Sequence, residues 1–132
     1  MIAEHLAELR HFSESMMRDT ATIERKSGST LDPDNGQQID TWALVVATPA
    51  RLLRTGVGGR RSQAAGQTVD RGEVEFRFPV TVTDLRVGDR VTFTASADPA
   101  IVGVPIPVVE VEYATDAVAR RAKGVVDEDR HV

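Results

Sequence analysis

Cysteine is absent from the 132-residue sequence, which excludes a disulfide framework and cysteine-based zinc sites and is typical of a protein made in a reducing compartment. Aromatic residues are scarce, at 5%, so a core must be built mainly from Val, Ile, Leu and Ala. No apolar run approaches the roughly 20 residues that a transmembrane helix needs. Met1–Arg10 carries Glu4 and Glu8 and no basic region before an apolar stretch, so we expect no signal peptide. These absences favour synthesis in the cytosol and no membrane insertion.

Charge of one sign does not dominate either. The formal net charge is −4, which gives the whole chain no attraction to nucleic acid or to a membrane surface. Hydrophobic residues make up 41% and charged residues 27%, an ordinary globular composition. The length suits one domain, and we predict a single domain over residues 1–132.

Residues that could converge on a catalytic or metal site are few. His5 and His11 lie six positions apart on a predicted helix and point in different directions, and His131 lies in a charged tail. Gly56–Arg61 lacks the spacing of a phosphate-binding loop, and no helix pattern follows it. No nucleophile elbow is present. We therefore expect no metal, no cofactor and no enzymatic activity.

Two groups of carboxylates have simpler interpretations than catalysis. Glu73 and Glu75 share one face of a predicted strand, as residues of a solvated outer surface do. Asp89 follows Gly88 and is typical of a turn residue that bonds nearby backbone amides.

The pattern of apolar residues predicts one helix followed by strands. Residues 2–17 carry a stripe at helical spacing that includes Leu6, Leu9 and Phe12, and this stripe packs either on the domain's own core or against another subunit. From residue 20 to 126 the period changes to two, with turn signals at close intervals. We predict a mainly β fold, a small barrel or sandwich of six to seven short strands.

The predicted strands are 20–26, 42–47, 50–54, 73–78, 90–94, 107–113 and 118–126, with Pro49 marking a break or a bulge between the second and third. Residues 27–38 are rich in turn formers. Residues 55–72, which hold five of the ten glycines, are predicted to form a long inserted loop, and residues 127–132 a frayed tail.

The segment from residue 51 to 72 is locally basic. It contains Arg51, Arg54, Arg60, Arg61 and Arg71 against Asp70 alone, a balance of +5 − 1 = +4. Such a segment either contacts phosphate or an acidic protein surface, or is simply a soluble loop. Because no aromatic residues are interleaved, a contact with DNA would involve the backbone and be indifferent to sequence.

Short motifs give the second half of the chain a family resemblance. The motifs are Phe78-Pro79, Val87-Gly88-Asp89-Arg90-Val91, Asp98-Pro99-Ala100-Ile101-Val102-Gly103 and Ala119-Arg120-Arg121. Upstream, Met16-Met17, Thr22-Ile23-Glu24-Arg25 and Pro49-Ala50-Arg51-Leu52 fall in the expected order. In order and spacing this set resembles the head-to-tail stopper proteins of siphophages, also called head-closure or head–tail connector proteins, most of all those from phages of actinobacteria.

The resemblance implies a small β-barrel with a helical decoration, repeated in a virion neck ring of roughly six or twelve copies. Such a ring has the portal and adaptor above it and the tail terminator or tail tube below, and it assembles in the host cytoplasm. The family also implies an inserted loop that blocks DNA exit. Residues 55–72 occupy that position, which makes Arg54, Arg60, Arg61 and Arg71 the candidates to face packaged double-stranded DNA. Leu6, Leu9 and Phe12 are the candidates for a subunit or adaptor interface.

Other functions remain open from sequence. An adaptor would be mainly helical, which the strand pattern contradicts, and a tail terminator is a further phage alternative. From another class, a free barrel could bind nucleic acid or a protein ligand, and it would be expected to expose aromatics on a sheet face. The neck protein is the leading hypothesis.

Overall fold

The computed structural model describes residues 2–54, 60–64 and 67–127, with side chains described for residues 4–54 and 72–126. Within these residues one helix precedes seven strands. They are α1 (Ile2–Ser15), β1 (Asp19–Leu31), β2 (Gln38–Arg54), β3 (Arg60–Ala64), β4 (Gln67–Phe78), β5 (Arg90–Ala95), β6 (Pro105–Glu112) and β7 (Arg120–Asp127), with a 3-10 turn η1 (Pro99–Ile101) before β6. The prediction of a mainly β fold with an N-terminal helix is confirmed.

The sheet closes on itself because β2 has two partners. Its residues up to Ala50 pair with β1, and Arg51–Arg54 pair with β4. The strand order β2-β1-β5-β6-β7-β4, with the β2–β4 pairing, therefore makes a closed antiparallel barrel. Closure removes the free edges of the body of the sheet. β3 pairs with β4 and lies outside the ring.

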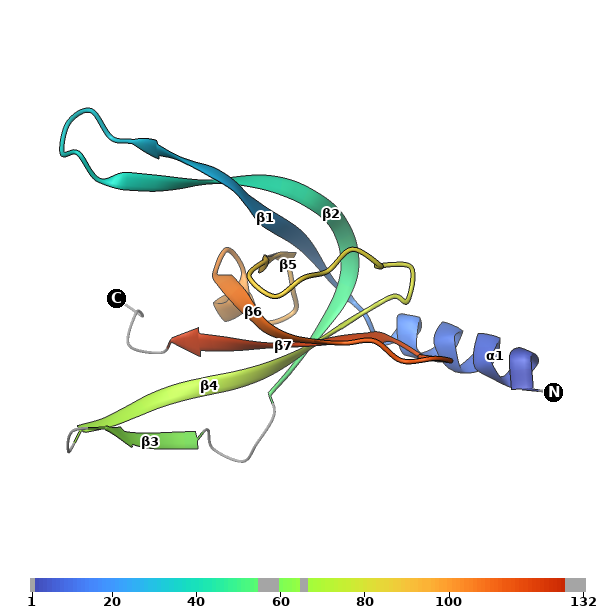
Figure 1. Cartoon of the computed structure of the whole chain (residues 1–132). Coiled ribbons are helices and arrows are strands. Elements are labelled where there is room, and N and C mark those ends of the chain that lie inside the picture. The colour runs from blue at the N-terminus through green and yellow to red at the C-terminus, as the bar shows by residue number, and fades with distance from the viewer. Residues whose placement is uncertain (1, 55–59, 65–66, 128–132) are drawn as a thin grey trace.

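Two hairpins leave the barrel on the side away from α1 (Figure 1). One is formed by the distal halves of β1 and β2 and turns at residues 32–37, where Gly36 has a φ of +71°. We call the part from Ser27 to Thr41 the arm. The other is the β3/β4 hairpin. The molecule is thus a small barrel with three projections.

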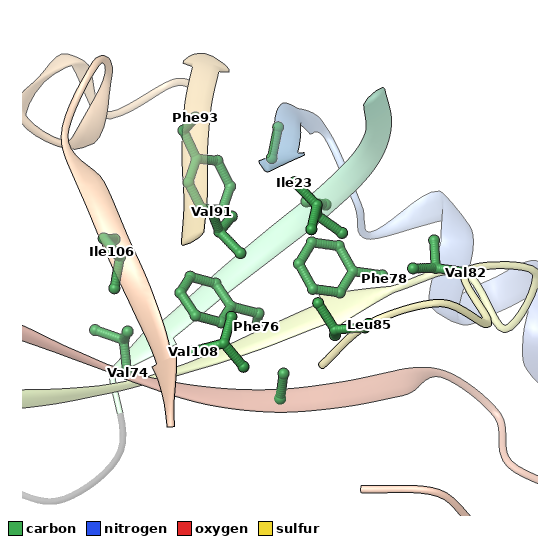
Figure 2. Close-up of a cluster of buried hydrophobic side chains, with 13 residues drawn as sticks. Ile23, Val74, Phe76, Phe78, Val82, Leu85, Val91, Phe93, Ile106 and Val108 are labelled. Atoms are coloured by element: carbon green, nitrogen blue, oxygen red, sulfur yellow. The ribbon is translucent and has the colours of Figure 1, made fainter. Parts of the chain in front are cut away.

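The core fills the barrel with alternate residues of its strands. Phe76 lies at its centre, with ring centroids 6.0 Å from Phe78 and 6.3 Å from Phe93 (Figure 2). Ile23, Val91 and the other buried aliphatic residues surround these rings. Three of the four phenylalanines of the chain lie in this cluster.

None of the described side chains of the helix is fully buried. Leu9 is 53% and Phe12 67% exposed, and Leu6 is half-buried. Arg10 Nε donates a hydrogen bond to the carbonyl of Ala117 at 2.9 Å, which ties the helix to the loop before β7. Of the two interpretations of the apolar stripe, packing on the domain's own core is wrong for Leu9 and Phe12. Met17, just beyond the helix, is buried instead.

Several predicted boundaries need correction. Much of the expected loop 55–72 is a hairpin, since residues 60–64 and 67–71 pair in register, while residues 55–59 and 65–66 lie outside the described residues. The expected break or bulge at Pro49 is wrong, because β2 runs through this residue and its register with β1 is regular there. Residues 27–31 and 38 belong to strands rather than to a turn region. The predicted tail begins one residue early, as Asp127 ends β7, and residues 128–132 lie outside the described residues.

Candidate functional site

The motif residues behind the sequence resemblance mainly hold turns in place. Asp89 is 2% exposed and accepts hydrogen bonds from Arg25 Nε at 2.9 Å and from the backbone amide of Arg86 at 3.0 Å. Gly88, with a φ of +97°, supplies the left-handed conformation of that turn. The interpretation of Asp89 as a turn residue that bonds a nearby amide agrees with these contacts.

Arg25 joins this turn to Asp84 as well. Its Nη1 lies 3.1 Å from Asp84 Oδ2 and its Nη2 donates to the Asp84 carbonyl at 3.1 Å. The hydrogen bonds that Arg25 donates to Asp89 and then to Asp84 raise the pKa of Arg25, and the hydrogen bond from Arg25 lowers the pKa of Asp84 below its usual range. A cation held between two carboxylates is a structural cross-link between β1 and the loop before β5.

Asp98 and Arg120 have similar roles. Asp98 caps η1 by accepting from the amide of Ala100 at 3.0 Å. Arg120 Nε donates to the carbonyl of Val82 at 3.0 Å, and its guanidinium lies 4.9 Å from the centroid of the Tyr113 ring. Tyr113 in turn donates its hydroxyl to the carbonyl of Leu85. These motif residues therefore have structural roles: they hold the turns and loops of the barrel in position.

The histidines and glutamates considered as catalytic candidates do not come together in one site in the described part of the chain. His5 and His11 are exposed on α1, and His131 lies outside the described residues. Glu75 accepts from Arg77 Nε at 3.0 Å on the outer face of β4. Among the residues described, no three His, Asp or Glu side chains lie together as metal ligands. In that same part no helix has the length and apolar character needed to cross a membrane.

One end of the barrel is hollow. A cavity of about 460 Å³ lies between η1 and strands β2, β4 and β7, and its lining includes Leu52, Val74, Ile101, Val104 and Val126 together with Asp19 and Arg54. Ser96 donates to Asp19 Oδ2 at 2.9 Å there. Arg54, a predicted DNA-facing residue, ends β2 beside this opening and is exposed.

The other three predicted DNA-facing residues lie on the β3/β4 hairpin. Arg60 pairs in register with Arg71, and Arg61 pairs with Asp70. Their side chains lie outside the described residues. The backbone register alone brings Arg60 and Arg71 to directly opposed positions on neighbouring strands, where Cβ atoms are about 5 Å apart.

A second group of arginines was missed from sequence. Arg51 on β2, Arg77 on β4 and Arg121 on β7 are consecutive partners in register and share the outer face of the barrel. The inward row beside them is Leu52, Phe76 and Ala122. Each arginine sits at an ordinary outward position of its own strand, so only the pairing of three strands distant in sequence reveals the row.

The arginine row forms one wall of a groove against the helix. We call it the arginine groove; it has a volume of about 200 Å³ and is lined by Arg51, Arg77 and Arg121 together with Leu9, Phe12, Ser13, Met16, Met17, Val118 and Ala119. Two of the three predicted interface residues, Leu9 and Phe12, thus border it. Leu6 lies about one turn closer to the N-terminus of the helix and does not line the groove.

The fold defines a class, a small closed β-barrel with a helix and two projecting hairpins. The chain belongs to DUF6093, a family of unknown function, which it matches over residues 9–124. No curated protein matches it. A solved structure described as "Virion of native gene transfer agent (GTA) particle" contains a chain that is 15% identical, with a TM-score of 0.40 over 82% of this chain and 94% of that chain.

Proposed function

We propose that this protein is a structural subunit of the neck of a tailed bacteriophage. In this proposal it catalyses no reaction. Copies form a ring below the portal and adaptor, close the DNA channel after packaging, and offer the face to which the tail terminator or tail tube attaches. The protein is made in the host cytoplasm and ends in the virion.

The observation that carries the proposal is the β3/β4 hairpin. It projects from the closed barrel at the position where the resemblance to stopper proteins implies an inserted channel segment. Its strands carry Arg60, Arg61 and Arg71 on an otherwise acidic chain. Arginine bonds phosphate oxygens without reading bases, which is the contact that a DNA-retaining plug needs.

The shape of the rest of the molecule supports a place in an assembly. A closed barrel needs no partner, but the arm is a two-stranded ribbon, and such ribbons are marginal in water when isolated. The helix leaves Leu9 and Phe12 largely exposed. Projections of this kind are typical of subunits that reach over their neighbours.

The proposal is tested by electron microscopy of lysates from the phage or prophage that encodes the chain, with an early stop codon in the gene. Separate tails beside heads that have lost their DNA are the expected result, and a plasmid copy of the gene should restore complete particles. Intact, infectious particles would overturn the proposal and favour a free barrel that binds nucleic acid or a protein ligand.

A second complementing copy separates closure from tail attachment. Replacing residues 57–71 by a short Gly/Ser linker removes the hairpin and leaves the barrel strands in place. We expect heads that join tails but leak DNA. Heads that stay full with this variant would show that the hairpin is not the plug.

A further inference from the structure

The arginine groove contains charge that the described part of the chain does not neutralise. Opposed residues on neighbouring strands have Cβ atoms about 5 Å apart, and like charges in such positions destabilise a sheet. Arg77 is paired with Glu75 at 3.0 Å. The guanidinium groups of Arg51 and Arg121 make no hydrogen bond or ion pair with any described side chain, although Glu112 is opposite Arg121 in register. The groove therefore has two arginines available for an anionic partner.

The apolar wall of the same groove is equally unfilled. Phe12 and Leu9 are more than half exposed, and Met16 lies beside them. Covering these side chains by a partner would remove apolar surface from water, which favours association. The chemistry of the groove thus fits a segment that presents both carboxylates and an aliphatic side chain.

The tip of the arm has this complementary chemistry. From Ser27 to Thr41 the arm contains Asp32, Asp34 and Asp40 and no Lys or Arg. Leu31 is exposed and lies opposite Gln38, so it shares a face of the ribbon with Asp40, two residues further along β2. Asp40 is bonded to Lys26 at 3.1 Å, whereas the Asp34 carboxylate has no partner among the described residues.

The arm of one molecule cannot fill its own groove. The arm tip and the helix lie at opposite ends of the molecule (Figure 1). The contact must therefore join two copies, with the arm of the first on the groove of the second. Such a head-to-tail contact is heterologous, and it closes into a ring when the rotation between copies allows.

We propose that the arm tip of one copy docks in the arginine groove of the next, with Leu31 covering the apolar wall at Phe12 and Leu9 and the aspartates facing Arg51 and Arg121. The inference rests on the proposed ring and names the contact that holds it together. Because the arm is long and two-stranded, docking at its tip also orders the ribbon.

Because the sequence has no cysteine, crosslinking tests the contact directly. Thr30→Cys on the arm and Ser13→Cys in the groove wall are conservative changes that spare the proposed contact residues. With a short bismaleimide, the double variant should give a ladder of dimers and higher multimers, in the purified chain or in particles that it complements. Each single variant should give none of the higher multimers. Thr30→Cys with Thr94→Cys, which is exposed on β5 outside the groove, is the matched control.

Charge reversal supplies a second readout. Asp34→Lys or Arg121→Glu alone should reduce the ladder about tenfold, and the two together should restore it. Complete tailed particles with a ladder no stronger than the Thr94 control, in both settings, would overturn the inference while leaving the proposed neck function intact. Intact particles from the stop-codon strain would instead remove the neck function.

Discussion

Arg25 and Asp89 are 64 positions apart in the sequence, and they form a two-pronged ion pair in which Nε–Oδ1 and Nη2–Oδ2 are both 2.9 Å. The Asp89 side chain is almost fully buried, whereas that of Arg25 is about a quarter exposed. The pair fastens the Gly88–Asp89 turn to β1, and so fixes where β5 begins beside β1.

Replacing Arg25 by Met should therefore destabilise the fold severely, because it leaves the buried Asp89 carboxylate with the Arg86 amide as its remaining described donor. We expect a loss of about 3 kcal/mol, the lower end for breaking a buried pair, since Arg25 is partly exposed. Urea denaturation measures it. Lys26→Met is the control: its exposed pair with Asp40 contributes about 0.5 kcal/mol or less. Equal effects of the two substitutions would contradict the structural role of the turn.

Acidification should weaken the link between Arg25 and Asp84. The pKa of Asp84 is lowered in the folded protein by the hydrogen bond from Arg25. Its contribution is thus present above the ordinary carboxyl pKa of about 4 and is lost as the pH falls through the lowered value. The difference in melting temperature between the wild type and Asp84→Asn should be constant from about pH 5 to 7 and shrink below about pH 4. A difference that grows on acidification has the wrong sign for this account.

Gly124 should tolerate no side chain. It is buried on β7, and a Cβ built there would lie 2.7 Å from Phe76 Cε2, 2.8 Å from the Pro107 carbonyl oxygen and 2.9 Å from Ile106 Cγ2. Since one of these neighbours is backbone, Gly124→Ala should destabilise by about 1–3 kcal/mol through overpacking. At Gly28 on the arm the nearest atom would be Thr41 Oγ1 at an ordinary 3.5 Å. Gly28→Ala should therefore be neutral or slightly stabilising in the same thermal melts.

Substitutions of two phenylalanines distinguish a residue of the core from a residue of the proposed interface. Phe76 stacks between two other rings in the core, so Phe76→Ala should lower the free energy of unfolding by about 3–5 kcal/mol. Phe12 is 67% exposed, and Phe12→Ala should change stability by less than about 0.5 kcal/mol. The same Phe12 substitution should weaken the crosslinked ladder. A large loss of stability with Phe12→Ala would mean that the helix packs on its own barrel after all.

Sequence periodicity predicted the strands that bury one face in the core. It did not predict the strand segments whose sequences lack alternating apolar residues. Val74, Phe76 and Phe78 alternate with charged residues and gave the inner half of β4 correctly. The arm and the β3/β4 hairpin are two-stranded ribbons with mostly polar sequences, so no apolar alternation marks them. The prediction at Pro49 was wrong because β2 pairs only with β1 at this residue and pairs with β4 from Arg51 onward. A strand position with a partner on one side only accepts proline. Likewise, the arginine row depends on the pairing of β2, β4 and β7, which no local pattern contains.

The two arginine groups offer a matched test of DNA contact. Arg60, Arg61 and Arg71 lie on the β3/β4 hairpin, and Arg51, Arg77 and Arg121 line the groove. Each triple change to Gln removes three positive charges, so both variants have the same net charge. Titration of labelled double-stranded DNA at several salt concentrations measures the affinity and its salt slope.

If the hairpin contacts phosphate, its variant should lose affinity and reduce the slope by roughly 0.9 for each contact removed, whatever the DNA sequence. The groove variant should keep the wild-type slope and lose the self-association ladder instead. Because net charge is matched, equal losses in the two variants would mean that DNA responds to overall charge alone, and the hairpin would then have no special part in holding the genome. A circular dichroism melt of each variant checks that the fold is retained, which matters most for Arg77→Gln because that change also removes the ion pair with Glu75.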